Sequence, residues 1–211
     1  MNPLAMAFSI VLACSAILAA MLVARARPSS RNYLRFAAAL YLSQALCSVL
    51  VAFAPGPATL GFSMAVTQLV SALAPVALCI ALFATFEHPP AAWIVATALV
   101  LACCAGILAA ALGKPLVSLA PMSVSALVMF ALCFRRWSSE KRSTSHAFLS
   151  ACCLVGAAAA SFSSGQSARI AVTLFSAAAL LGFALALARR SGVAIANERD
   201  LRAAMPVSEN R

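Results

Sequence analysis

Charged residues are scarce in this sequence, and acidic ones most of all. Only 9% of the 211 residues are charged, with five Asp and Glu in total, while 64% are hydrophobic and the mean hydropathy is +1.00. Soluble globular domains are about a quarter charged. This balance excludes a soluble domain, and the chain is expected to lie in a membrane.

Catalytic and cofactor motifs are also missing. No Asp, Glu, Lys, Arg or His lies deep in any long apolar segment, although proton relays and transporters of charged substrates usually keep one there. Paired carboxylates, a Ser/His/Asp set and a His-Glu-X-X-His spacing are absent, and the last segment has no lysine for a retinal Schiff base. The sequence therefore predicts a protein that is not an enzyme and that uses no metal or other cofactor.

Apolar segments account for most of the chain. A helix needs about 20 apolar residues to cross the hydrocarbon core of a bilayer, and the stretch 60–86 exceeds this without a single charge. We predict an all-α polytopic membrane protein, with a bundle of seven transmembrane helices in one domain, 1–190, and a short cytoplasmic tail, 191–211. The predicted spans are 4–24, 36–54, 60–86, 91–112, 115–134, 147–164 and 170–188.

Basic residues indicate the orientation. Of the 15 Lys and Arg residues, all but Lys114 and Arg169 fall on one side of the predicted bundle. Because cytoplasmic loops carry the excess of Lys and Arg, the N-terminus is expected outside and the C-terminus inside. The Arg- and Ala-rich composition is typical of a bacterial protein, so we expect the inner (cytoplasmic) membrane. The net charge of +10 does not indicate nucleic-acid binding, because the basic residues gather at helix ends.

The most polar positions inside the spans are Gln44, Thr67, Gln68 and Ser71. Gln68 and Ser71 share a helix face, as do Thr67 and Ser71, by their spacing of three and four residues. Two interpretations remain open. These side chains form hydrogen bonds between helices, worth about 0.6 kcal/mol each in membranes, or they line a small polar ligand pocket beside a hinge at Pro75.

Eight cysteines permit a second pair of interpretations. Cysteine is a small hydrophobe that packs helices closely, but it can also bind metal or form disulfides. Adjacent helical residues point about 100° apart, so neither Cys103-Cys104 nor Cys152-Cys153 can direct both sulfurs to one point. Cys47 with Cys103, or Cys79 with Cys152, match better in depth. The full set is Cys14, Cys47, Cys79, Cys103, Cys104, Cys133, Cys152 and Cys153.

Small residues recur every fourth position in three of the segments. Such stripes allow close approach of helix backbones. We expect segments four, six and seven to form a compact unit, with a homodimer face as one further interpretation. The stripes are Ala102-Gly106-Ala110, Cys152-Gly156-Ala160-Ser164 and Ala178-Gly182-Ala186.

The basic loops on the predicted cytoplasmic side are the expected contact surface for a partner or for anionic lipid, at about 1 kcal/mol per nearby basic residue. The residues singled out are Arg135, Arg136, Lys141, Arg142, Arg189 and Arg190.

Part of the sequence shows a family-like pattern. A basic loop with an Arg-Pro pair opens the second segment, a Pro-containing turn leads to a long third segment with a central amide, and that segment exits through Phe83-Ala84-Thr85-Phe86-Glu87-His88-Pro89-Pro90 to Trp93. This resembles the seven-helix N-terminal membrane sensor regions found ahead of bacterial diguanylate cyclase (GGDEF-type) or kinase output domains, over residues 20–100. In that family the last helix leads into a cytoplasmic linker and a catalytic domain. No catalytic motif is present here, so the resemblance implies a sensor without its own output.

The leading hypothesis is a non-enzymatic sensory or regulatory module that signals through its basic loop and tail to a cytoplasmic signalling protein. The alternatives are a small permease for a neutral or lipid-like solute, lined by the four polar residues, and a scaffold subunit of a membrane complex. The expected partners are the lipid bilayer, a cytoplasmic signalling protein or membrane-complex subunits, and a second copy of the chain. The ligand, the partner and the oligomeric state stay open.

Overall fold

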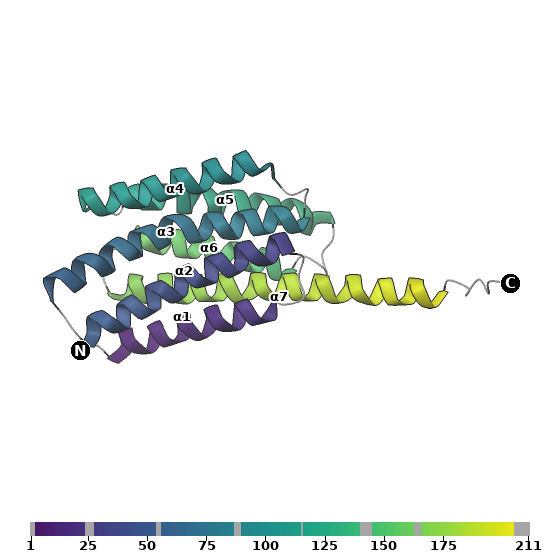
Figure 1. The fold of residues 1–211 in the computed structure, drawn as a ribbon, viewed down its shortest axis with the longest axis horizontal. Coiled ribbons are helices and arrows are strands. Elements are labelled where there is room, and N and C mark those ends of the chain that lie inside the picture. The colour runs from purple at the N-terminus through teal and green to yellow at the C-terminus, as the bar shows by residue number, and fades with distance from the viewer. Residues whose placement is uncertain are drawn as a thin grey trace.

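Over the residues that it describes, the computed structural model contains seven helices and confirms the all-α class (Figure 1). It describes residues 3–23, 28–53, 56–86, 90–114, 116–139, 145–162 and 166–204. The helices are α1 (Pro3–Leu22), α2 (Pro28–Phe53), α3 (Pro57–Phe86), α4 (Ala92–Leu112), α5 (Leu116–Ser139), α6 (Ser145–Ser161) and α7 (Gln166–Ala204).

Local sequence explains several of the helix ends. Helices α2 and α3 each begin with a proline, Pro28 and Pro57, whose fixed φ and missing N–H suit the first helical position. Helix α4 stops at Gly113, which takes a left-handed φ of 62° and donates its N–H to the carbonyl oxygens of Ala109 and Ala110. Glycine adopts that conformation without the strain that a Cβ would introduce.

Five of the described helices are long and apolar enough to cross a membrane. The qualifying stretches are Ser30–Leu50, Pro57–Thr85, Ala92–Leu112, Val117–Arg136 and Ile170–Arg190. The two remaining apolar stretches, Ala7–Leu22 and Ser145–Ser161, are shorter. The prediction of a membrane-spanning helical bundle is thus confirmed for five of the seven predicted spans.

Six helices form a closed ring, and the seventh lies outside it. The close contacts follow the order α1, α2, α3, α5, α6, α7 and back to α1, while α4 packs on α3 and α5 from outside (Figure 1). Rings of Phe130 on α5 and Phe148 on α6 lie 5.5 Å apart at one of these contacts. The chain therefore closes on itself, with α1 beside α7.

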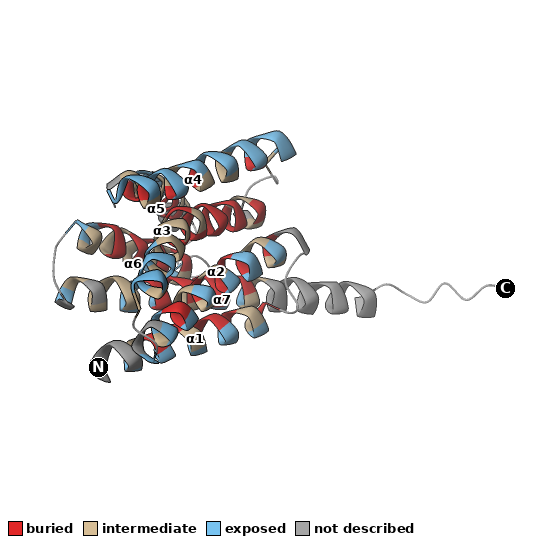
Figure 2. Ribbon diagram, turned by 60° about the vertical axis from the view of Figure 1, so that its left-hand side comes forward, coloured by how far each residue is buried: buried red, intermediate tan, exposed pale blue. Residues whose placement is uncertain are grey.

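Helix α3 is the most buried span of the bundle. In the most apolar stretch of α3, 61% of the residues are buried, compared with 22% in α4. Figure 2 shows α4 largely exposed. The outward side chains of α4 include Trp93, Val100 and Leu101. Because lipid tails are as apolar as leucine, such a surface is stable in a bilayer.

Small residues permit two close helix contacts, one between α3 and α4 and one between α6 and α7. A contact of α4 with α6 or α7, which the stripes of small residues predicted, is not among the main helix contacts. A Cβ added at Gly106 of α4 would stand 2.9 Å from the Cα of Leu69 on α3, and one added at Gly182 of α7 would overlap the Oγ of Ser150 on α6. The expected unit of segments four, six and seven is therefore wrong in part. Helices α6 and α7 do pack together, whereas α4 packs against α3 and α5, because its glycine stripe faces the backbone of α3.

Helix α7 continues well beyond the apolar part of the chain. It runs without a break from Gln166 to Ala204, although its candidate span ends at Arg190. At 1.5 Å per residue, the further 14 residues to Ala204 extend about 21 Å (Figure 1). The predicted tail 191–211 thus begins as a continuation of the last helix, and residues 205–211 lie outside the described part.

Candidate functional site

Most of the polar and basic residues singled out from the sequence lie in two regions of the bundle: the middle of α3, and one end that we call the basic end. At the basic end α2 begins near Arg31 and Arg35, α5 finishes near Arg135 and Arg136, and α7 leaves the bundle at Arg189 and Arg190 (Figure 1).

Gln68 connects α3 to α5. Its Oε1 accepts a hydrogen bond from the Oγ of Ser118 on α5, and Ser118 is only 1% exposed. The same turn of α3 lies against α4, since a Cβ at Gly106 would come within 3.3 Å of the Gln68 carbonyl oxygen. The Gln68 side chain thus joins helices where α3, α4 and α5 meet, as the hydrogen-bonding interpretation predicted.

Thr67 and Ser71 bond within their own helix. The Thr67 Oγ1 donates to the Ser63 carbonyl at 2.8 Å, and the Ser71 Oγ donates to the Thr67 carbonyl at 2.7 Å. Their hydroxyl protons are therefore already engaged, and each hydroxyl has only one. Gln44 lies on α2, half-buried, and its backbone carbonyl accepts a hydrogen bond from Ser48 Oγ at 2.9 Å.

Pro75 lies fully inside α3, in an uninterrupted helix, and is buried. Proline has no N–H, so the carbonyl of Ser71, four residues earlier, loses its usual helical partner. The Ser71 hydroxyl therefore donates a hydrogen bond to the Thr67 carbonyl, while the Ser71 carbonyl receives none from the N–H position of residue 75. This is the local basis for treating Pro75 as a hinge.

Two side-chain contacts were not anticipated from the sequence. Tyr41 of α2 is buried and its hydroxyl lies near the side chain of Ser176 on α7, although α2 and α7 are not neighbours in the ring. The tyrosine therefore reaches across the ring interior. Its position in the middle of a span was a usable signal, because membrane tyrosines usually lie at the interfaces.

The second contact joins α2 and α3 at the basic end. The Thr85 Oγ1 lies 2.6 Å from the Ala81 carbonyl and 3.1 Å from the Ser30 Oγ. Since a hydroxyl has one proton, Thr85 donates to the carbonyl and accepts from Ser30. The start of α2 is thereby held against the last turn of α3.

A narrow apolar crevice lies beside this contact. Its volume is about 10 Å³, which is room for one water-sized group, and it is partly open. Three helices contribute the lining, α2, α3 and α7. The lining residues are Leu34, Ala81, Leu82, Thr85, Phe183, Ala186 and Leu187.

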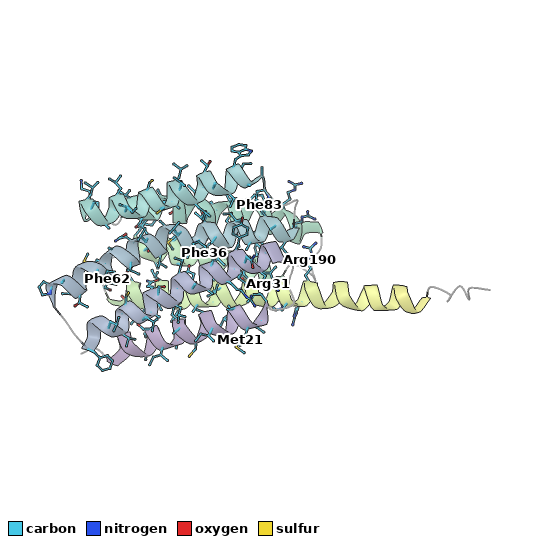
Figure 3. The ribbon with its side chains drawn as sticks, in the orientation of Figure 1. Met21, Arg31, Phe36, Phe62, Phe83 and Arg190 are labelled. Carbon is cyan, nitrogen blue, oxygen red and sulfur yellow. The ribbon has the colours of Figure 1, made fainter. Side chains whose placement is uncertain are left out.

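The predicted basic contact residues divide by exposure. Arg135 and Arg189 are exposed, while Arg136 and Arg190 are half-buried. Lys141 and Arg142 lie outside the described residues. Arg31, which was not singled out from the sequence, is half-buried like Arg190 (Figure 3).

The cysteines are all free thiols. Cys133 of α5 is buried, and Cys79 on α3 and Cys152 on α6 are near enough to interact with it electrostatically. Cys47 and Cys103 belong to α2 and α4, which do not pack together. Within the described part of the chain, no group of three His, Cys, Asp or Glu side chains is arranged to hold a metal ion.

These observations define the class: an all-α membrane protein in which Gln68–Ser118 and Ser30–Thr85 connect helices, while hydroxyls such as those of Thr67 and Ser71 bond within their own helix. The sequence matches no known family model, and neither a curated protein nor a solved structure is similar to it.

Proposed function

We propose that the chain is a non-enzymatic sensory or regulatory module of the bacterial inner membrane, with its N-terminus outside and the basic end facing the cytoplasm. The observation that carries the proposal is the continuity of α7, which runs from the bundle interior to Ala204. A helix that is packed in the bundle and extends beyond it can transmit a change in packing to a partner outside the membrane.

The contacts of α7 with other helices would bring a change in bundle packing to α7. The helix contacts α1 and α6 along the ring, and the contact between Tyr41 and Ser176 couples it to α2. A rearrangement around Pro75 in α3 would reach α7 through α2 or through the crevice that α2, α3 and α7 share. The cytoplasmic surface at Arg135, Arg136, Arg189 and Arg190 would then present the change to a signalling protein.

The test interrupts α7 where it leaves the bundle. Gly192→Pro removes a helical hydrogen bond and costs about 3 kcal/mol or more in a helix interior, while Gly192→Ala keeps the helix and serves as the matched control. Tagged protein would be purified from its native membrane in mild detergent, with mass spectrometry of whatever accompanies it.

We expect a cytoplasmic signalling protein to accompany the wild type and Gly192→Ala, and to be lost from Gly192→Pro at equal membrane yield. Fixed stoichiometry with other membrane proteins would instead indicate the scaffold subunit. If reconstituted protein carried a neutral solute into vesicles at enzyme-like rates, and Gln68→Ala abolished this, the permease would replace the sensory proposal. The engaged hydroxyls of Thr67 and Ser71 weigh against that outcome.

A further inference from the structure

We infer that the basic end of the bundle holds a binding site for one anionic phospholipid, with its phosphate between Arg31 and Arg190 and its first methylene groups against the apolar crevice of α2, α3 and α7. The inference concerns binding alone. It can be tested on the purified chain without any signalling partner, so its failure would be distinct from failure of the proposed function.

Helix geometry places both arginines beside the crevice. Arg31 is three residues before Leu34 on α2, and Arg190 is three residues after Leu187 on α7; both leucines line the crevice. Residues three apart lie on the same helix face, so the two arginines continue the crevice walls towards the end of the bundle. Figure 3 shows both at the end from which α7 extends.

Burial distinguishes these two arginines from their neighbours. The Nε of Arg31 and the Nη1 of Arg190 are buried, whereas Arg35 and Arg189, on the same two helices, are exposed. Both half-buried arginines also make contacts within the protein. A guanidinium has five N–H donors in a planar fork, so it can hold a protein group and a phosphate oxygen together.

The chemistry favours a phosphate ester with a hydrocarbon part. Guanidinium groups recognise phosphate through paired, charge-assisted hydrogen bonds. The crevice lining is apolar apart from Thr85, whose hydroxyl is engaged with Ala81 and Ser30. Free phosphate would leave this apolar lining unused, whereas a lipid covers it with methylene groups.

The depth of the site also fits a lipid headgroup. Ala81, Leu82 and Thr85 lie in the last two turns of α3, which ends at Phe86. The arginines flank this level at the ends of α2 and of the α7 span, where long basic side chains reach the headgroup region. The crevice has room for about one methylene-sized group, so nearly all of the acyl chain would lie on the helix surface in the surrounding bilayer.

The test compares buried with exposed arginines. Purified protein in neutral detergent would be titrated with phosphatidylglycerol and observed by native mass spectrometry, with phosphatidylcholine of the same chains and inorganic phosphate as separate arms. We expect the protein to bind one phosphatidylglycerol molecule more tightly than any further one. Arg31→Gln or Arg190→Gln should weaken the affinity for this molecule by at least about tenfold, since a charged hydrogen bond contributes about 1.5 kcal/mol or more.

Arg35→Gln is the matched control, because it removes the same charge from the same helix as Arg31, about one helical turn away. It should change the apparent Kd by less than about twofold, as expected for a screened surface charge. Equal weakening by all three variants would overturn the inference and indicate a diffuse electrostatic effect. Equal affinity for phosphatidylcholine, or displacement of the lipid by inorganic phosphate at similar concentration, would overturn it as well.

The crevice is tested without any change of charge. Ala186→Leu would fill it, and we expect phosphatidylglycerol binding to weaken while the basic residues remain. Unchanged binding in a variant that unfolds at the wild-type temperature would show that the crevice takes no part. If that variant is less stable, the comparison of buried and exposed arginines still decides the question.

Discussion

We expect one methyl group added at Gly182 to weaken the contact between α6 and α7. The new Cβ of Gly182→Ala would overlap the Ser150 Oγ and lie 3.2 Å from the Ser150 Cβ and 3.5 Å from the His146 carbonyl oxygen. The Ser150 Oγ cannot turn away without loss, because it donates to that carbonyl at 2.6 Å. Either the helices separate by some tenths of an ångström or the hydrogen bond breaks.

The expected magnitude follows from two opposing terms. Overpacking a well-packed contact costs about 1–3 kcal/mol, whereas alanine is favoured over glycine in a helix by up to about 1 kcal/mol. We expect Gly182→Ala to lower the free energy of unfolding by about 1–2 kcal/mol. Adding Ser150→Ala removes the overlapping oxygen and leaves only the 3.2 Å contact between β-carbons, so the double variant should recover most of the loss.

The assay is unfolding of the purified protein in mixed micelles by increasing SDS, followed by circular dichroism. Gly61→Ala is the control, because a Cβ there meets nothing within 4 Å, and it should not destabilise the protein. Wild-type stability of Gly182→Ala would refute the α6–α7 contact as described. A double variant no more stable than the single one would show that Ser150 is not the obstacle.

Three further predictions use the same assay. Gly106→Ala should lower the free energy of unfolding by about 1–3 kcal/mol. Adding Leu69→Ala should not restore the lost stability, because the new Cβ meets the Leu69 Cα, which alanine also has. Restored stability would contradict this account of the α3–α4 contact. Gln68→Ala and Ser118→Ala should show a coupling of about 0.6 kcal/mol in a double-mutant cycle, and additive effects would mean that their hydrogen bond contributes nothing. Gly113→Ala should cost about 1 kcal/mol because its φ is 62°, and an unchanged midpoint would argue against that turn.

Hydropathy predicted the number and order of the helices but not their ends. The second span was predicted from residue 36, yet α2 begins at Pro28, and α5 continues to Ser139 beyond the predicted 134. Hydropathy reports which residues are suited to lipid, whereas a helix continues as long as its backbone hydrogen bonds do. The same distinction explains why α7 extends past the apolar segment.

Helix neighbours were harder to predict than helices. The stripe at Gly106 correctly indicated a surface for close approach, but a stripe does not say which helix will use it. Likewise, the polarity of Gln68 suggested a hydrogen bond between helices, and only the packing of α5 on α3 identifies Ser118 as the donor. The pairing of Tyr41 with Ser176 depends on two helices that reach each other only across the ring interior.

The closure of the ring has a consequence for synthesis. Helix α1 ends at Leu22, and its neighbour α7 begins only at Gln166. At the usual rate of translation, roughly ten to thirty seconds separate the emergence of the two helices. Throughout that interval the face of α1 that will contact α7 must be covered by lipid or by another protein. A ribosome stalled after α6 would therefore leave an open ring that membrane chaperones or proteases can distinguish from the finished protein.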